Sequence, residues 1–99
     1  MIVVSGTLEI GEEGRERAME AARKMAVASR AEEGCISYAF YADLENPSVV
    51  RVFEEWQDDQ ALADHFDTPH MKEFRESLVG VDLRSRAIKH YVVQEVGDL

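Results

Sequence analysis

Apolar and polar residues alternate at the start of the chain, between residues 2 and 10. Ser5, Thr7 and Glu9 fall on one side of this alternation, and the apolar residues fall on the other: Ile2, Val4, Leu8 and Ile10. A period of two is typical of a β-strand that buries one face. We therefore predict a first strand over residues 2–10, ended by the glycines that follow it.

Small apolar residues then recur with the period of an α-helix, from about residue 14 to residue 31. The stripe consists of Ala18, Ala22, Met25 and Ser29, widened by Ala21 and Ala28. Side chains this small let a helix lie close to a sheet. Gly34 follows the helix, and we expect it to adopt the left-handed conformation in which many helices end.

The remaining apolar runs predict two strands, two helical stretches and a last strand. Asp58 or Asp59 can cap the first helical stretch, and Pro69 suits the first position of the second. The predicted ranges are strands over 35–42 and 49–56, helices ending near Phe66 and Gly80, and a strand over 83–96.

This order, β-α-β-β-α-β, is that of the ferredoxin-like split βαβ arrangement, an α+β fold with an antiparallel sheet. We expect a single domain over residues 1–99, because a chain of 99 residues has no room for a second core.

Three of the predicted strands carry apolar residues on both faces. Tyr38 and Phe40 share one face of their strand with Ile36, while Ala39 and Tyr41 lie on the other. The other two strands set Val50, Val52 and Trp56 against Val49 and Phe53, and Ile88 and Val92 against Ala87, Tyr91 and Val93. Helices cover one face of such a sheet, and an exposed apolar face of this extent usually marks an interface. We therefore expect a homodimer whose two sheets pack face to face.

Charge and cysteine content limit the partners and the compartment. Twenty Asp and Glu against 11 Lys and Arg give a net charge of −9, and no basic stripe gathers the positive residues. Such a chain repels phosphate backbones and anionic lipids, so we expect neither nucleic acid nor membrane as a partner. No apolar run is long enough to span a bilayer, and the first residues lack the features of a signal peptide. With Cys35 as the single cysteine, we expect a cytoplasmic protein.

Several short motifs along nearly the whole chain resemble a known family. They are Glu33-Gly34-Cys35-Ile36-Ser37-Tyr38, Asn46-Pro47, Phe53-Glu54-Glu55-Trp56-Gln57-Asp58, Ala61-Leu62-Ala63-Asp64-His65-Phe66 and Thr68-Pro69-His70. In these motifs the chain resembles the antibiotic biosynthesis monooxygenase (ABM) family of dimeric α/β barrels, which includes cofactor-independent quinol monooxygenases.

The resemblance implies a homodimeric barrel with a pocket between sheet and helices in each subunit. It implies oxidation of a small phenolic or quinol-type aromatic substrate by O₂, with no cofactor. The same fold serves other chemistries, so three alternatives stay open: haem degradation, isomerisation of a phosphorylated signalling sugar, and non-catalytic binding of a small molecule. Haem-degrading members use an Asn on the first strand, where this chain offers only Ser5 and Gly6.

His65 is the first candidate for chemistry. It follows Leu62 by three positions on a predicted helix, so it should face the sheet. We interpret it as a general base or hydrogen-bond donor at the pocket wall, or else as a hydrogen-bonded structural histidine. His70 lies on the first turn after Pro69, and the pattern leaves open which of the two histidines faces the pocket.

Glu54 and Trp56 are further candidates, because they share one face of their strand with valines. A register that pairs Glu54 with Tyr38 would also put Ile36 beside Trp56. A carboxylate on an apolar face needs a partner. It could act as a base or orient His65, or simply accept a hydrogen bond from a tyrosine. Tyr38 or Trp56 could donate hydrogen bonds to a substrate.

Neither a metal nor a nucleotide cofactor is expected from the sequence. His65 and His70 are five residues apart across a proline, whereas a zinc-binding helix spaces its histidines by four. The chain also contains no glycine-rich phosphate loop.

Overall fold

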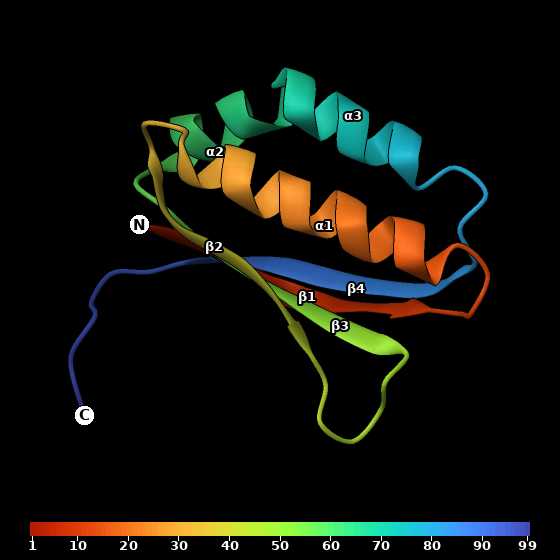
Figure 1. Ribbon diagram of the computed structural model, residues 1–99. Coiled ribbons are helices and arrows are strands. Elements are labelled where there is room, and N and C mark those ends of the chain that lie inside the picture. The colour runs from red at the N-terminus through yellow and green to blue at the C-terminus, as the bar shows by residue number, and fades with distance from the viewer.

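One antiparallel sheet carries three helices on a single face (Figure 1). The computed structural model describes all 99 residues. The elements in chain order are β1 (Ile2–Ile10), α1 (Arg15–Arg30), β2 (Cys35–Ala42), β3 (Val49–Trp56), α2 (Asp59–Phe66), α3 (Pro69–Ser77) and β4 (Leu83–Val92). The strands lie in the order β2-β3-β1-β4. The predicted ferredoxin-like α+β fold is thereby confirmed, with its second helical segment split into α2 and α3.

The core lies between the sheet and the helices. Every second residue of β1 is buried, beginning with Ile2, as the alternation predicts. The small side chains of α1 lie against the sheet, although Ala26 is buried there and Ala28 only half-buried. The largest apolar cluster is completed by β2, β3 and α3 and consists of Ile2, Val4, Met25, Ala26, Tyr38, Val52, Trp56 and Met71.

The last strand is shorter than the sequence suggests. β4 ends at Val92, which pairs with Ile2, the first residue of β1. Beyond it only Val93 makes a backbone hydrogen bond, from its N–H to the carbonyl oxygen of Met1 at 2.9 Å. After Val93 the C-terminal segment leaves the sheet (Figure 1). No helix is long and apolar enough to cross a membrane.

Gly34 does not adopt the expected left-handed conformation. Positive φ values occur only at Gly14 and Gly80, and α1 ends at Ala31 in an ordinary right-handed conformation. Gly34 instead lies against α2, where a Cβ atom would overlap the Cβ of Ala61. The glycine is therefore required by the close approach of α2 to the β2 end of the sheet.

A β-bulge changes the register of β2 at one end. Tyr38 pairs with Glu54, which is the register considered from the sequence, but the register then shifts and Cys35 pairs with Trp56. Ile36, which we expected beside Trp56, is 53% exposed. A bulge places two residues of one strand opposite one of its partner. This extra residue moves Ile36 out of the core.

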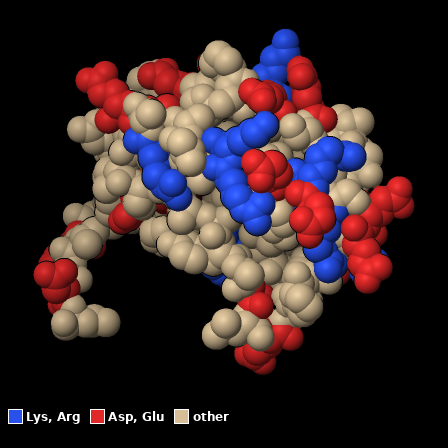
Figure 2. All heavy atoms as spheres, in the orientation of Figure 1, with Lys and Arg blue, Asp and Glu red and all other residues tan.

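The face of the sheet that carries no helix is partly apolar. Arg51 donates a hydrogen bond to the hydroxyl of Ser5 across this face, at 3.1 Å. Apolar side chains share this face, half-buried at Val3, Ala39 and Phe53 and exposed at Ala87 and Tyr91. In Figure 2 several basic side chains lie across the middle of the view, over the helical layer, and acidic side chains lie beside and around them.

The contact between Gly34 and Ala61 leads to a stability prediction. We expect Gly34→Ala to lower the free energy of unfolding by about 1–3 kcal/mol, because the added methyl group overpacks the α2 contact. Adding Ala61→Gly should restore part of this loss, although glycine by itself weakens a helix by about 1 kcal/mol. Urea denaturation of the two single variants and the double variant measures both effects. Gly97→Ala is the control, since a Cβ there meets no atom within 4 Å. Simple additivity of the two changes would contradict the proposed contact.

Candidate active site

A cavity of about 230 Å³ lies between the sheet and helix α3. Most of its lining is apolar, with Val4 and Leu8 from β1 and Met71 and Phe74 from α3 among the lining residues. Three charged residues also line it: Glu54 from β3, Arg75 from α3 and Arg86 from β4. Cavities of this kind, apolar with a few polar groups, are the usual binding sites for small molecules.

A larger hollow of about 480 Å³ lies between α1 and β2, but it contains no imidazole or carboxylate. Its charged groups are Arg23 and Arg30 alone. The smaller cavity is therefore the better candidate for acid–base chemistry.

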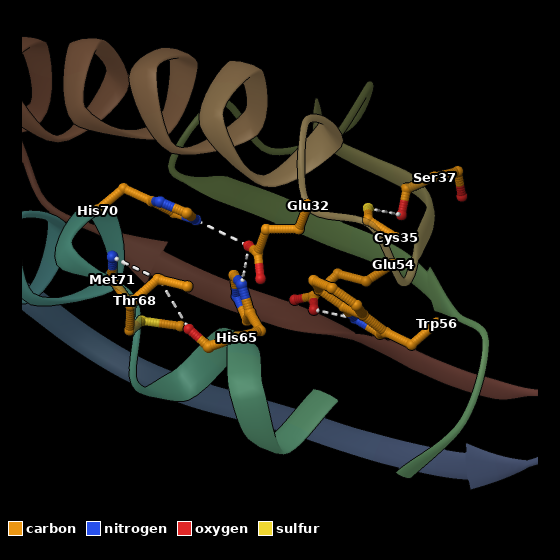
Figure 3. A network of polar contacts seen from close by, with 9 residues as sticks. All are labelled: Glu32, Cys35, Ser37, Glu54, Trp56, His65, Thr68, His70 and Met71. Atoms are coloured by element: carbon orange, nitrogen blue, oxygen red, sulfur yellow. Dashed lines mark hydrogen bonds and ion pairs between the residues drawn. The ribbon is translucent and has the colours of Figure 1, made fainter. Parts of the chain in front are cut away.

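Glu54 is the one acid in the lining of the smaller cavity. Its side chain points inward from β3, and the residue is 7% exposed. The indole N–H of Trp56 donates a hydrogen bond to its Oε1 at 2.8 Å (Figure 3). Burial raises the pKa of the Glu54 carboxyl from 4.5 to about 7, with Glu32 adding to the rise and the Trp56 hydrogen bond opposing it. Glu54 therefore changes its charge close to neutral pH and can accept a proton there.

Tyr38 lies opposite Glu54 and also lines the cavity. Its ring contacts those of Phe40 and Trp56 edge-on, with centroid separations of 5.6 and 6.3 Å. Burial raises the pKa of the Tyr38 hydroxyl above its usual range, and Glu54 raises it further. The hydroxyl therefore stays protonated and can donate a hydrogen bond to a ligand.

His65 lies beside these residues, but it does not line the cavity. Its ring is fully buried against Trp56 and Tyr38, at centroid separations of 4.5 and 5.6 Å. Burial lowers the pKa of His65, although a hydrogen bond to Glu32 opposes this effect. From the sequence we expected His65 at the pocket wall. In the structure its side chain supports the two aromatic rings instead.

Glu32, His65 and His70 form a polar network (Figure 3). The sequence did not predict the part played by Glu32. The Oε2 atom of Glu32 lies 2.6 Å from Nδ1 of His65 and 2.7 Å from Nε2 of His70. His70 thus faces the same carboxylate as His65, and neither imidazole lines the cavity. Glu32 precedes His65 by 33 positions, and no local pattern in the sequence links them.

Two arginines bring positive charge to the cavity. Arg86 from β4 lines it, whereas the neighbouring Arg84 donates to Asp82 at 3.2 Å. Arg75 from α3 also lines the cavity.

Cys35 does not take part in this chemistry. Burial raises the pKa of its thiol to about 11, and the negative charge of Glu32 adds to the rise. The thiol is therefore protonated, and it donates a weak hydrogen bond to the carbonyl oxygen of Ser37 at 3.5 Å. A protonated thiol is a poor nucleophile.

The family described as antibiotic biosynthesis monooxygenase, ABM, matches residues 1–77. The chain belongs to this family. The resemblance seen in the sequence motifs is thereby confirmed over more than half of the chain. The matched residues include Tyr38, Glu54 and Trp56, and also both histidines of the Glu32 network.

Individual ABM relatives extend this comparison. The uncharacterized protein sll1783 of Synechocystis is 34% identical over 98 residues, which cover 99% of this chain and 67% of that protein. The protein named "Putative monooxygenase YcnE" of Bacillus subtilis is 30% identical over 74 residues, which cover 75% of this chain and 78% of YcnE.

Solved structures share the fold. A conserved protein from Methanosarcina mazei superimposes with a TM-score of 0.83 at 30% identity, covering 91% of this chain and 89% of that one. The structure of a Deinococcus radiodurans protein described as a "putative antibiotic biosynthesis monooxygenase" superimposes with a TM-score of 0.87 at 24% identity. It covers 100% of this chain and 98% of that one, and at this identity it supports the fold alone.

The raised pKa of Glu54 predicts how stability depends on pH. The folded chain holds this proton more tightly than the unfolded chain, so the stabilisation is fully present below pH 4.5 and is lost as the pH rises through about 7. Glu54→Gln stays neutral and keeps an acceptor for Trp56. Its free energy of unfolding should therefore rise relative to the unmodified chain by about 3 kcal/mol between pH 4.5 and pH 8.

Urea denaturation at a series of pH values measures this difference. Glu55→Gln is the matched control, because Glu55 lies on the opposite face of β3 and accepts a hydrogen bond from Ser37. A difference between Glu54→Gln and the unmodified chain that stays constant across this pH range would show that Glu54 titrates normally.

Proposed function

We propose that this ABM protein is a cofactor-independent monooxygenase that oxidises a small phenolic or quinol-type aromatic molecule with O₂. The observation that carries the proposal is the lining of the 230 Å³ cavity, where one carboxyl with a pKa near 7 and two guanidinium groups occupy otherwise apolar surroundings. The family and its relative YcnE support the reaction type. The substrate class is the one that the family resemblance implies, and a mostly apolar lining with one carboxyl group suits it.

The first step is removal of the phenolic proton by the Glu54 carboxylate. A carboxylate with a pKa of about 7 is a stronger base than an ordinary glutamate, and the buried site excludes the water that would compete for it. Trp56 holds the carboxylate through its indole N–H, and so acts as a positioning residue. The substrate leaves this step as an electron-rich phenolate.

The phenolate then passes one electron to O₂, which gives a phenoxyl radical and superoxide. These recombine at a ring carbon that carries hydrogen, and the resulting hydroperoxide loses water to leave a carbonyl group. One oxygen atom enters the product and the other leaves as water, so no external reductant is required. Arg75 and Arg86 supply positive charge for the anionic species, and the protonated Tyr38 supplies a hydrogen-bond donor.

His65 has an indirect part in this proposal. It lies outside the cavity lining, but its buried ring packs against Tyr38 and Trp56. We therefore assign it as a positioning residue in place of the catalytic base suggested by the sequence.

Oxygen uptake with a panel of naphthoquinols and anthrones tests the monooxygenase. We expect at least one substrate to be oxidised, with kcat/KM rising as the pH passes through about 7 because Glu54 must be ionised. Glu54→Gln should lower kcat/KM by about 100-fold and remove this pH dependence. Glu55→Gln should leave both unchanged.

Binding is followed in the same samples through the fluorescence of Trp56, the single tryptophan of the chain. Ligands that change the fluorescence without oxygen uptake would identify a binding protein and contradict the monooxygenase. Arg86→Gln should lower kcat/KM by about tenfold, because its exposed guanidinium is partly screened by water. The neighbouring Arg84→Gln should have no such effect, since Arg84 lies outside the lining.

We further propose that two copies pack their uncovered sheet faces together as a homodimer. The apolar side chains on that face, Val3, Ala39, Phe53, Ala87 and Tyr91, support this arrangement, because no helix covers that face. The small size of the domain gives a second reason, since a chain of 99 residues buries a limited apolar area alone.

Light scattering coupled to size-exclusion chromatography measures the oligomeric state. We expect twice the mass of one chain for the unmodified protein and a shift towards one chain for Phe53→Glu, which places a charge within the proposed interface. Val79→Glu is the control, because Val79 is 76% exposed in the segment after α3. A monomer at micromolar concentration would contradict the dimer.

A further inference from the structure

The network of Glu32, His65 and His70 has the donor atoms of a metal site. Nδ1 of His65, Nε2 of His70 and a carboxylate oxygen of Glu32 all lie within 4.8 Å of one another. Figure 3 shows both imidazole rings directed at the same carboxylate, from α2 and from α3 respectively. Glu32 belongs to the turn between α1 and β2, so the three side chains come from three separate parts of the chain.

The break between α2 and α3 explains why two histidines five residues apart converge. In a continuous helix, residues at this spacing differ by about 140° around the axis and cannot share a ligand. Here Thr68 ends one helix and caps the next. Its Oγ1 donates to the carbonyl oxygen of His65 at 2.8 Å and accepts from the N–H of Met71 at 3.2 Å. The spacing of four expected of a single zinc-binding helix therefore does not apply.

We propose that Glu32, His65 and His70 bind a divalent transition-metal ion, with Zn²⁺ as the best match. Two imidazole nitrogens and one carboxylate oxygen form the protein ligand set of a zinc site that keeps its fourth position open. Oxygen-preferring ions such as Mg²⁺ and Ca²⁺ suit this set poorly, since two of the three donors are nitrogen.

At the present distances the Glu32 carboxylate accepts hydrogen bonds from both rings. Ligands around a tetrahedral Zn²⁺, each about 2.0–2.1 Å from the ion, lie roughly 3.3 Å apart. The Glu32 oxygen would thus retreat by roughly 0.6 Å from each imidazole nitrogen. Each ring must also give up the proton that faces Glu32. In His65 that proton moves to Nε2, which is buried and has no acceptor, so the change of tautomer costs part of the binding free energy.

Access and rigidity both favour a bound ion. The side chain of His65 is 1% exposed and is fixed against Trp56 and Tyr38, whereas those of Glu32 and His70 are 15% and 22% exposed. An ion can therefore reach the site from the His70 side, where its open position would meet water. None of the three residues lines the 230 Å³ cavity. The proposed metal site is thus separate from the proposed monooxygenase site, and its test does not require turnover.

Calorimetric titration of chelator-treated protein with Zn²⁺ tests the proposal, and Co²⁺ serves as a second probe by visible absorption. We expect one ion per chain and the intense visible bands of four-coordinate Co²⁺. His70→Gln and Glu32→Gln should each weaken Zn²⁺ binding by at least about tenfold. These two positions are partly exposed, so the variants avoid emptying the core at His65. Circular dichroism checks that each variant is folded.

Matched controls come from the same chain. His90→Gln removes the third histidine, on β4, and Glu33→Gln removes the carboxylate next to Glu32, so both should bind Zn²⁺ like the unmodified protein. Equal Zn²⁺ affinity for the unmodified protein and His70→Gln would overturn the proposal. That result would mean that the network is held by hydrogen bonds alone and that any bound ion sits elsewhere.

Discussion

The hydrogen bond from the Trp56 indole to the Glu54 carboxylate joins the core of this protein to its candidate active site. Trp56 is fully buried, so its N–H needs an acceptor inside the protein. Glu54, two residues earlier on the same face of β3, is the acceptor at 2.8 Å. This arrangement holds a carboxyl group in apolar surroundings, where burial raises its pKa to about 7. The residue that satisfies the largest core side chain is thus also the one best suited to accept a substrate proton.

Much of the fold follows from the sequence, because hydrophobic periodicity depends on neighbouring residues. The alternation over β1 was predicted in this way, and the pairing of Tyr38 with Glu54 is the register that we considered for β2 and β3. The bulge that exposes Ile36 and the role of Gly34 were not. Both depend on how β2 and α2 approach the rest of the sheet, and no local pattern records that approach. A glycine after a helix is most often a left-handed cap, whereas here the contact with Ala61 is the reason for it.

The candidate site was predicted in part, for a related reason. Tyr38, Glu54 and Trp56 lie on two adjacent strands, so their proximity follows from strand register. The network around His65 is built from distant segments, because Glu32 follows α1 and His70 lies on α3. The proximity of these residues depends on how the helices pack in three dimensions. We propose a positioning role for His65 in place of the general base suggested by the sequence, because its ring lies against Trp56 and Tyr38, outside the cavity lining. Long-range contacts of this kind cannot be read from the chemical type of a residue and its neighbours in sequence.

The bulge in β2 has a further consequence, for solubility. β2 is an edge strand of the sheet, and edge strands expose backbone groups that can pair with another chain. A β-bulge bends the strand and interrupts the regular spacing of its hydrogen-bonding groups. Because the register shift lies between Cys35 and Ser37, the flat part of the open edge is shortened. The irregularity that removes Ile36 from the core therefore also protects the chain against uncontrolled growth of the sheet into aggregates.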